Sequence, residues 1–274
     1  MLEDLFGPAP SALTVFCFFA GSGLAFYLGL ASLSHLWFFV LRRRRYFGTD
    51  APERGDVARS LLWGTLSIIG NAALMTPIHL LIMDGHSQVY ADAALHGWPW
   101  LLASVALLLI FTETAIYWIH RALHLRFLYR HLHLAHHRFR VTSPWTGLSF
   151  HPLDSFAQAA PYHLAVFLFP VHELVYFVAV GLVTVWAVAI HDRVTLVRWG
   201  FVNNTGHHTA HHWYNKYNYG QYFTFWDKLC GTWKSPDDLP ERFASSWLLR
   251  RPAERAPGTA PARVAEPVLP GEMA

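Results

Sequence analysis

Long apolar runs with few charged positions divide this chain into segments that can cross a lipid bilayer. No charged residue occurs in residues 5–40, and the run ends at Leu41, directly before four consecutive arginines at 42–45. A second charge-free run covers residues 60–83, and a third apolar run covers 100–119. Because about 20 apolar residues in a helix span the hydrocarbon core, these runs predict three membrane-spanning helices.

The arginine cluster indicates how these helices are oriented. Cytoplasmic ends of membrane helices carry an excess of Lys and Arg. We therefore expect residues 42–45 on the cytoplasmic side, the second helix running outward and the third running back. This topology brings His120, at the end of the third run, to the cytoplasmic face.

The stretch 155–190 contains a single charge, Glu173. A single crossing would place every later histidine on the opposite side from those at 120–137. A hairpin turning at "FPVHE" instead has arms of about 17 residues, or roughly 25 Å at 1.5 Å per residue, just able to cross a core of about 30 Å. Only the hairpin lets all the histidines meet. We predict an all-α integral membrane protein with four transmembrane helices and a cytoplasmic histidine-rich helical cap built from residues 120–154 and 191–240.

Composition agrees with a membrane protein and divides the chain into three regions. Hydrophobic residues make up 53% of the 274 residues and charged residues 14%, against roughly 25% charged in soluble domains. The net charge of +3 gives no reason to expect nucleic acid, and two cysteines exclude a disulfide framework. The expected regions are a transmembrane hairpin and outer loop at 1–100, a catalytic region at 101–240 with the third helix, the histidines and the second hairpin, and a disordered tail at 241–274.

Three histidine clusters, "HRALH", "HLAHH" and "HTAHH", carry the candidate chemistry. Positions i, i+3 and i+4 are neighbours on one helix face, so each cluster is expected to aim two or three imidazoles at a common point. One such pair is a weak signal, but three pairs at membrane boundaries are a strong one. The candidate metal ligands are His120, His124, His133, His136, His137, His208, His211 and His212, with His191 in "AIHD" as a ninth.

The number of imidazoles predicts two metal ions, because a zinc site uses three or four protein ligands. Imidazole suits zinc, copper, nickel and iron alike. Iron is favoured by location, since the C–H bonds of lipids resist hydrolytic chemistry but yield to iron and O2. The required electrons are expected from an external donor, because nothing in the chain resembles a flavin, haem or iron–sulfur module.

A few further side chains could act as ligands or orient them. Glu113 lies seven residues before His120, on the same helical face, where an unpaired carboxylate is costly. His151 in "SFHPLD" is either a ligand or part of the turn before Pro152. His207 is off the face of its cluster and is left out. Carboxylates that could accept the second N–H of a metal-bound histidine are Asp154, Asp192 and Asp227.

The histidine spacing on a membrane scaffold resembles the fatty acid hydroxylase and sterol desaturase superfamily. The segments "FTETAIYWIHRALH", "SFHPLDSFAQAAPYH", "AIHD" and "GHHTAHHWYNKYNYGQYFTFWDKLCGTW" are similar to the sterol C-5 desaturases, or lathosterol oxidases, over about residues 106–235. The resemblance implies two non-haem iron ions, O2 as co-substrate, and insertion of a C5–C6 double bond into a Δ7-sterol. It also implies an external haem or iron–sulfur carrier with its reductase, and the three histidine clusters as iron ligands, with His191 and His151 beside them.

One position departs from this pattern, and alternatives remain open. Sterol C-5 desaturases carry a further histidine shortly before the His-Pro pair, where this chain has Leu148 in "TGLSFHP". A hydroxylase of the same superfamily, acting on a fatty acyl chain, a methylsterol or a carotenoid, is the nearest alternative. A membrane metal transporter is disfavoured, because transport sites lie near the bilayer midplane. The expected location is a bacterial inner membrane or an endoplasmic reticulum, with the active site on the cytoplasmic face.

Overall fold

The computed structural model describes residues 7, 10–47, 54–197, 199–239 and 246–247. The disordered tail predicted at 241–274 lies outside the described residues, apart from the two-residue strand β4 (Ser246–Trp247).

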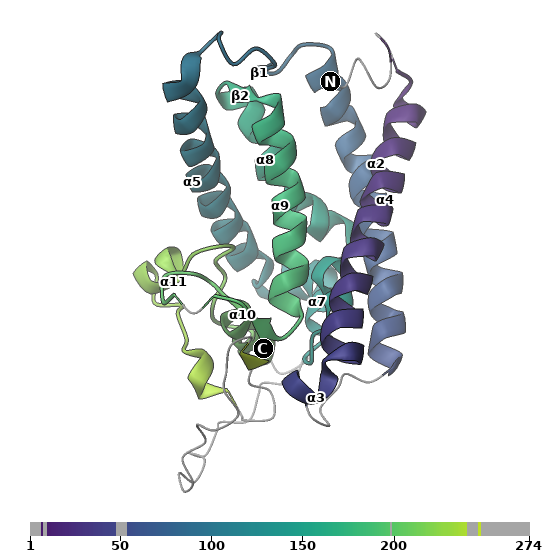
Figure 1. The fold of residues 1–274 in the computed structure, drawn as a ribbon, viewed down its shortest axis with the longest axis vertical. Helices are drawn as coiled ribbons and strands as arrows, with labels where there is room; N and C mark the ends of the chain where they lie inside the picture. Colours follow the sequence, from purple (N-terminus) through teal and green to yellow (C-terminus); the bar gives the residue numbers. More distant parts are fainter. Residues whose placement is uncertain (1–6, 8–9, 48–53, 198, 240–245, 248–274) are drawn as a thin grey trace, which may run out of the picture.

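Long helices form an upright bundle that makes up most of the described molecule (Figure 1). Four of them are long and apolar enough to cross a membrane, as the sequence predicts. The ends of these helices differ by a few residues from the ends of the predicted apolar runs. The four are α2 (Ala12–Ser34) with its π-helical continuation η1 (His35–Leu41), α4 (Arg54–Met83), α5 (Gly97–Leu123) and α9 (Glu173–His191).

The predicted hairpin is present, and its first arm is a further, shorter helix of the bundle. This arm, α8 (Pro152–Leu168), has 17 residues and is followed by β2 (Val171–His172) and then by α9. Strand β2 pairs in parallel with β1 (Val89–Tyr90) and so ties the hairpin turn to the loop between α4 and α5. The return of α9 brings residue 191 back to the end of the bundle where α5 ends, as the sequence argument requires (Figure 1).

The helices pack closely at two levels of the bundle. Toward the hairpin turn, Ile82, Leu108 and Tyr176 belong to one buried apolar cluster. Toward the other end, the fully buried Tyr27 packs with Trp145 and donates a hydrogen bond of 2.6 Å to its carbonyl oxygen. Burial of this apolar surface between helices fixes the frame on which the cap is built.

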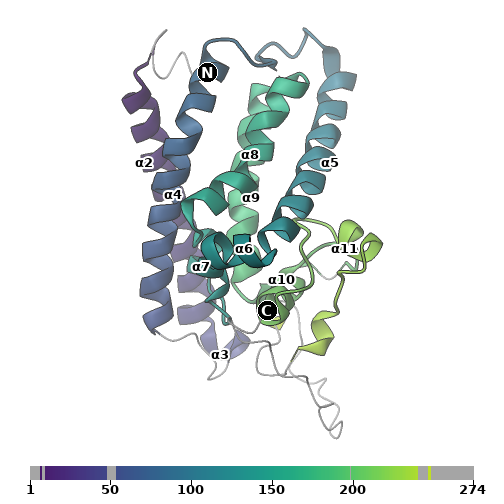
Figure 2. The same ribbon diagram turned by 180° about the vertical axis from the view of Figure 1, so that it is seen from behind.

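The cap closes one end of the bundle with short helices and loops. Figure 2 shows α6, α7 and α10 at this end, and the basic helix α3 at the same end. Strands β3 and β4 pair in parallel. The remaining elements are α3 (Arg43–Tyr46), α6 (Arg126–Leu128), η2 (Tyr129–His133), α7 (Leu134–His137), η3 (Pro144–Leu148), β3 (Val194–Thr195), α10 (Thr205–Tyr214), α11 (Phe225–Leu229) and η4 (Pro236–Asp238).

Candidate metal centre

Nine histidines converge at the junction of the bundle and the cap, and they form two groups. In each group, one potential ligand atom per residue lies within 4.8 Å of those of all the others, and each group could hold a metal ion. The nine are those that the sequence nominates, including His191. The five-histidine group contains His120, His124, His133, His137 and His211, and the four-histidine group contains His136, His191, His208 and His212.

Each of the three clusters directs two histidines into one group, and two of the clusters also direct a third histidine into the other group. His133 and His137 enter the five-histidine group, whereas His136 enters the other group. In the last cluster His208 and His212 stay together, and His211 points to the five-histidine group. The reason is helical geometry: residues i and i+4 project about 40° apart, whereas consecutive residues project about 100° apart. Each of these two clusters therefore contributes to both groups.

The ring nitrogens approach one another in the way that metal ligands do. Nε2 of His137 lies 3.1 Å from Nε2 of His133 and 3.0 Å from Nε2 of His211. In the other group, Nε2 of His191 lies 2.8 Å from Nε2 of His208 and 3.2 Å from that of His212. A metal bound at about 2.1 Å from each nitrogen holds neighbouring ligands roughly 3 Å apart.

In three of the histidines a hydrogen bond from Nδ1 leaves Nε2 available to bind a metal. Nδ1 of His211 lies 2.7 Å from the carbonyl oxygen of Tyr217, and Nδ1 of His120 lies 2.9 Å from that of Tyr219. Nδ1 of His191 lies 2.5 Å from the carbonyl oxygen of Ala187. A carbonyl only accepts, so these Nδ1 atoms carry the proton, and Nε2 of each ring keeps a lone pair that it offers to its group. Lone pairs in such contacts are satisfied by a cation, so the donor set fits metal binding.

Asp154 contacts one of the candidate ligands, as its suggested role requires. Its Oδ2 lies 2.7 Å from Nδ1 of His133, and both side chains are fully buried. Its Oδ1 accepts a hydrogen bond of 2.8 Å from Gln158. The carboxylate thus holds the His133 ring with Nε2 directed into the five-histidine group.

Glu113 and Asp227 reach the site indirectly, through the loop that follows α10. Glu113 accepts hydrogen bonds from the backbone N–H groups of Tyr222 (2.8 Å) and Phe223 (3.2 Å). Asp227 accepts from those of Tyr219 (2.9 Å) and Gly220 (2.8 Å). The two buried carboxylates therefore position the loop whose Tyr219 carbonyl orients His120. The sequence gives no sign that the carbonyls of Tyr217 and Tyr219 contact histidines.

The other candidates lie outside both groups. His151 caps the N-terminus of α8, where its Nδ1 accepts from Leu153 N–H at 3.2 Å. Asp192 is buried and accepts from Val194 N–H at 2.8 Å. His207, left out on the sequence argument, completes the cap of α10 with Asn204.

Burial keeps six histidines of the two groups neutral. It lowers the pKa of His211 to about 3, and it lowers the pKa of the other five well below the usual value, with neighbouring histidines adding repulsion between protonated rings. A neutral imidazole is the form that binds a metal. The others with this shift are His124, His136, His137, His208 and His212.

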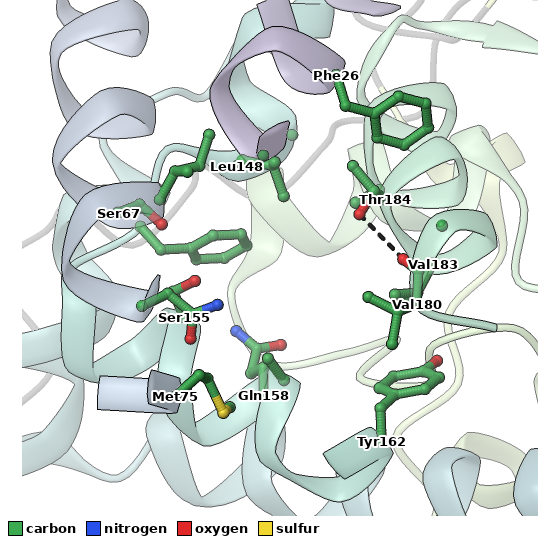
Figure 3. A pocket seen from close by; sticks show the side chains of 18 of the residues that line it. Phe26, Ser67, Met75, Leu148, Ser155, Gln158, Tyr162, Val180, Val183 and Thr184 are labelled. Carbon is green, nitrogen blue, oxygen red and sulfur yellow. Dashed lines mark hydrogen bonds between the residues drawn. The ribbon is translucent and has the colours of Figure 1, made fainter. Parts of the chain in front are cut away.

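A cavity of about 580 Å³ leads from the histidine groups into the bundle, between α2, α4, α8 and α9. His136 and His191 form part of its wall, and so does Leu148. Figure 3 shows Ser67 and Leu148 on one side of the open space, with Val180 and Thr184 on the other. A cavity of this size with mostly apolar walls is typical of small-molecule sites.

Comparison with known proteins identifies the family. The model of the fatty acid hydroxylase family matches residues 105–232, which include all nine histidines. A lathosterol oxidase of Rattus norvegicus is 38% identical over 225 residues, covering 78% of this chain and 75% of that protein. A Delta(7)-sterol 5(6)-desaturase of Gibberella zeae is 34% identical over 245 residues, covering 87% and 72%. No solved structure matches. Because identity above a third extends over most of both chains in the first comparison, this chain belongs to the fatty acid hydroxylase family.

Proposed function

We propose that this protein is a sterol desaturase that introduces a C5–C6 double bond into a Δ7-sterol. The observation that carries the proposal is the cavity, whose walls run from four of the candidate ligands into the apolar bundle. The activities for which the relatives are named supply the substrate class and the position of the new bond. The lining of the cavity is mostly apolar, as a four-ring lipid requires.

The reaction has a simple balance. Two hydrogens leave adjacent carbons of the sterol, an external donor supplies two electrons and two protons accompany them, and O2 leaves as two molecules of water. Two non-haem iron ions held by the five-histidine and four-histidine groups would supply the redox chemistry with O2. The electron donor we propose is a separate haem or iron–sulfur carrier with its reductase.

The contribution of the chain's own residues is positioning and exclusion of water. Walls from four helices restrict rotation of a flat substrate, so that the same two carbons stay beside the histidine groups. Asp154 and the carbonyls of Tyr217 and Tyr219 hold three histidine rings in place from behind. Rigid support of this kind keeps ligands in their productive geometry.

We place the cap on the cytoplasmic side of the endoplasmic reticulum or of a bacterial inner membrane. The arginine-rich helix α3 lies at the same end of the bundle as α7 and α10, which carry histidines of both groups (Figure 1). The positive-inside rule assigns that end to the cytoplasm.

The test uses a host that accumulates Δ7-sterols because it lacks its own C-5 desaturase. Expression of this chain is expected to produce sterols with the ultraviolet absorption of a conjugated 5,7-diene. The His136→Ala/His137→Ala variant removes one ligand from each group and is expected to abolish the diene. The matched control is His131→Ala, an exposed histidine outside both groups. Absence of the diene from cells with folded, iron-loaded protein and a competent donor would refute the C-5 assignment.

A hydroxylase activity is the second candidate, and one observation favours it. Leu148, at the position where the sequence departs from the sterol C-5 pattern, lies in the cavity wall. A changed wall residue can change the substrate or its orientation, and with it the product. Mass spectrometry of the same lipid extracts separates the two outcomes, because hydroxylation adds one oxygen atom and desaturation removes two hydrogens.

A further inference from the structure

A second polar cluster lines the cavity away from the histidine groups. It consists of His79 on α4, His163 on α8 and Tyr176 on α9, and we call it the distal cluster. Nδ1 of His163 is hydrogen-bonded to the Tyr176 hydroxyl. The His163 ring lies edge-on to the His79 ring, with centroids 5.0 Å apart. None of the three belongs to either metal group.

His79 is held firmly, but one of its ring nitrogens has no hydrogen bond within the described part of the chain. Its ring stacks on Phe19 with centroids 3.8 Å apart and an angle of 9° between the planes. The side chain is only 4% exposed, and its Nδ1 is buried without a hydrogen-bond partner among the described residues. Burial of an unpaired polar group is costly, so a buried imidazole in a cavity wall indicates a bound partner.

The distance between the distal cluster and the histidine groups is similar to the length of a flat lipid substrate. Asp154, which contacts His133, and His163 are nine residues apart on α8, or about 14 Å at 1.5 Å per residue. Asn71 and His79, which both line the cavity from α4, are about 12 Å apart by the same measure. A flat substrate whose reacting carbons lie at the histidine groups therefore extends its far end to the distal cluster.

We propose that the distal cluster binds a hydroxyl group on the side chain of the substrate, which makes the preferred substrate a side-chain-hydroxylated lipid. This inference rests on the proposed function. The ring hydroxyl of a sterol is only a few bonds from C5, so it stays near the histidine groups and does not reach His79. A plain hydrocarbon side chain would leave the imidazole unpaired.

The chemistry of the cavity favours a neutral hydroxyl over a charged group. The described residues of the lining include no Lys, Arg, Asp or Glu that could pair with a charge. A hydroxyl both donates and accepts, so it can pair with an unprotonated ring nitrogen or with a ring N–H of His79. A site built to bind a hydroxyl discriminates strongly against the analogue that lacks it.

The experiment compares two substrates, a Δ7-sterol with a saturated hydrocarbon side chain and the same sterol with a hydroxyl near the end of that chain. Purified, iron-loaded protein with an electron donor is assayed for kcat/KM on each. We expect the wild-type protein to prefer the hydroxylated sterol at least tenfold, as about one well-placed hydrogen bond provides. His79→Phe keeps an aromatic ring against Phe19 and should lose this preference, whereas His79→Gln should retain part of it.

The matched control is His86→Phe, an exposed histidine outside the cavity, which should keep the preference. Equal kcat/KM for both sterols in the wild-type protein, or an unchanged preference in His79→Phe, would overturn the inference while leaving the proposed function intact. If neither sterol yields a diene, the proposed function fails. Protection against thermal unfolding then decides the inference. It stands if the hydroxylated sterol protects the wild-type protein at a concentration tenfold lower than the unhydroxylated sterol requires, and if His79→Phe shows no such difference. Any other result overturns it.

Discussion

At the scale of residues, Asp154 is a buried acidic side chain that contacts a candidate ligand directly, through Nδ1 of His133. Asp154→Asn keeps the shape of the side chain but removes its charge and one of its acceptor oxygens, so His133 loses its fixed tautomer. We expect the affinity for iron to fall by about 10- to 100-fold. Competition with a chelator of known affinity measures the change.

Asp238→Asn, at a half-exposed carboxylate paired with Lys234, is the matched control and should bind iron normally. Normal affinity in Asp154→Asn would show that the hydrogen bond contributes packing alone.

At the scale of elements, α10 supplies ligands to both groups. Paired substitutions can nevertheless remove ligands from one group and leave the other complete. The double variant His208→Ala/His212→Ala leaves the four-histidine group with two ligands and the other group intact. The mirror variant His124→Ala/His133→Ala leaves three ligands in the five-histidine group, one of them from α10. Because a stable site needs about three or four protein ligands, the first variant is expected to hold half the iron of the wild type and the second to retain more. Elemental analysis of purified protein gives the ratio. Loss of all iron in the first variant would mean that the two sites form only together.

The elements also show how far a single sequence can predict a site. Helical spacing is enough to nominate eight of the nine histidines, and topology is enough to bring residue 191 to the others. The assignment of His136 and His137 to different groups depends on where α7 lies relative to α5 and α10, which no local pattern contains. The carbonyls of Tyr217 and Tyr219 are equally hidden, because every residue has a carbonyl and only the folded loop directs these two at histidines. Similarly, the apolar run containing His79 predicts its helix and leaves its place in a cavity wall unseen.

At the scale of the whole molecule, the buried histidines make both metal content and stability sensitive to acid. In the unfolded chain they titrate near pH 6.5, whereas burial lowers the pKa of His211 to about 3 in the folded protein. Between these values the unfolded chain binds more protons, so the free energy of unfolding falls as pH drops below about 6.5. Protons also compete with the metal for the same nitrogens. We expect metal loss and a falling unfolding temperature to coincide between pH 6.5 and 5, measured on detergent-solubilised protein. Retention of full metal content and stability at pH 5 would contradict this coupling.

The orientation of the whole molecule can be tested with its two cysteines. Cys17 lies in the membrane-spanning part of α2, whereas Cys230 follows α11 in the cap and is partly exposed. A thiol reagent that cannot cross membranes should therefore modify Cys230 only from the side that the cap faces. If the cap is cytoplasmic, sealed inside-out vesicles from a bacterial host react, and right-side-out vesicles react only after permeabilisation. Cys17→Ser should preserve this pattern and Cys230→Ser should remove it. Reaction in intact right-side-out vesicles would place the histidine groups on the outer face, and would require an electron donor on that side of the membrane.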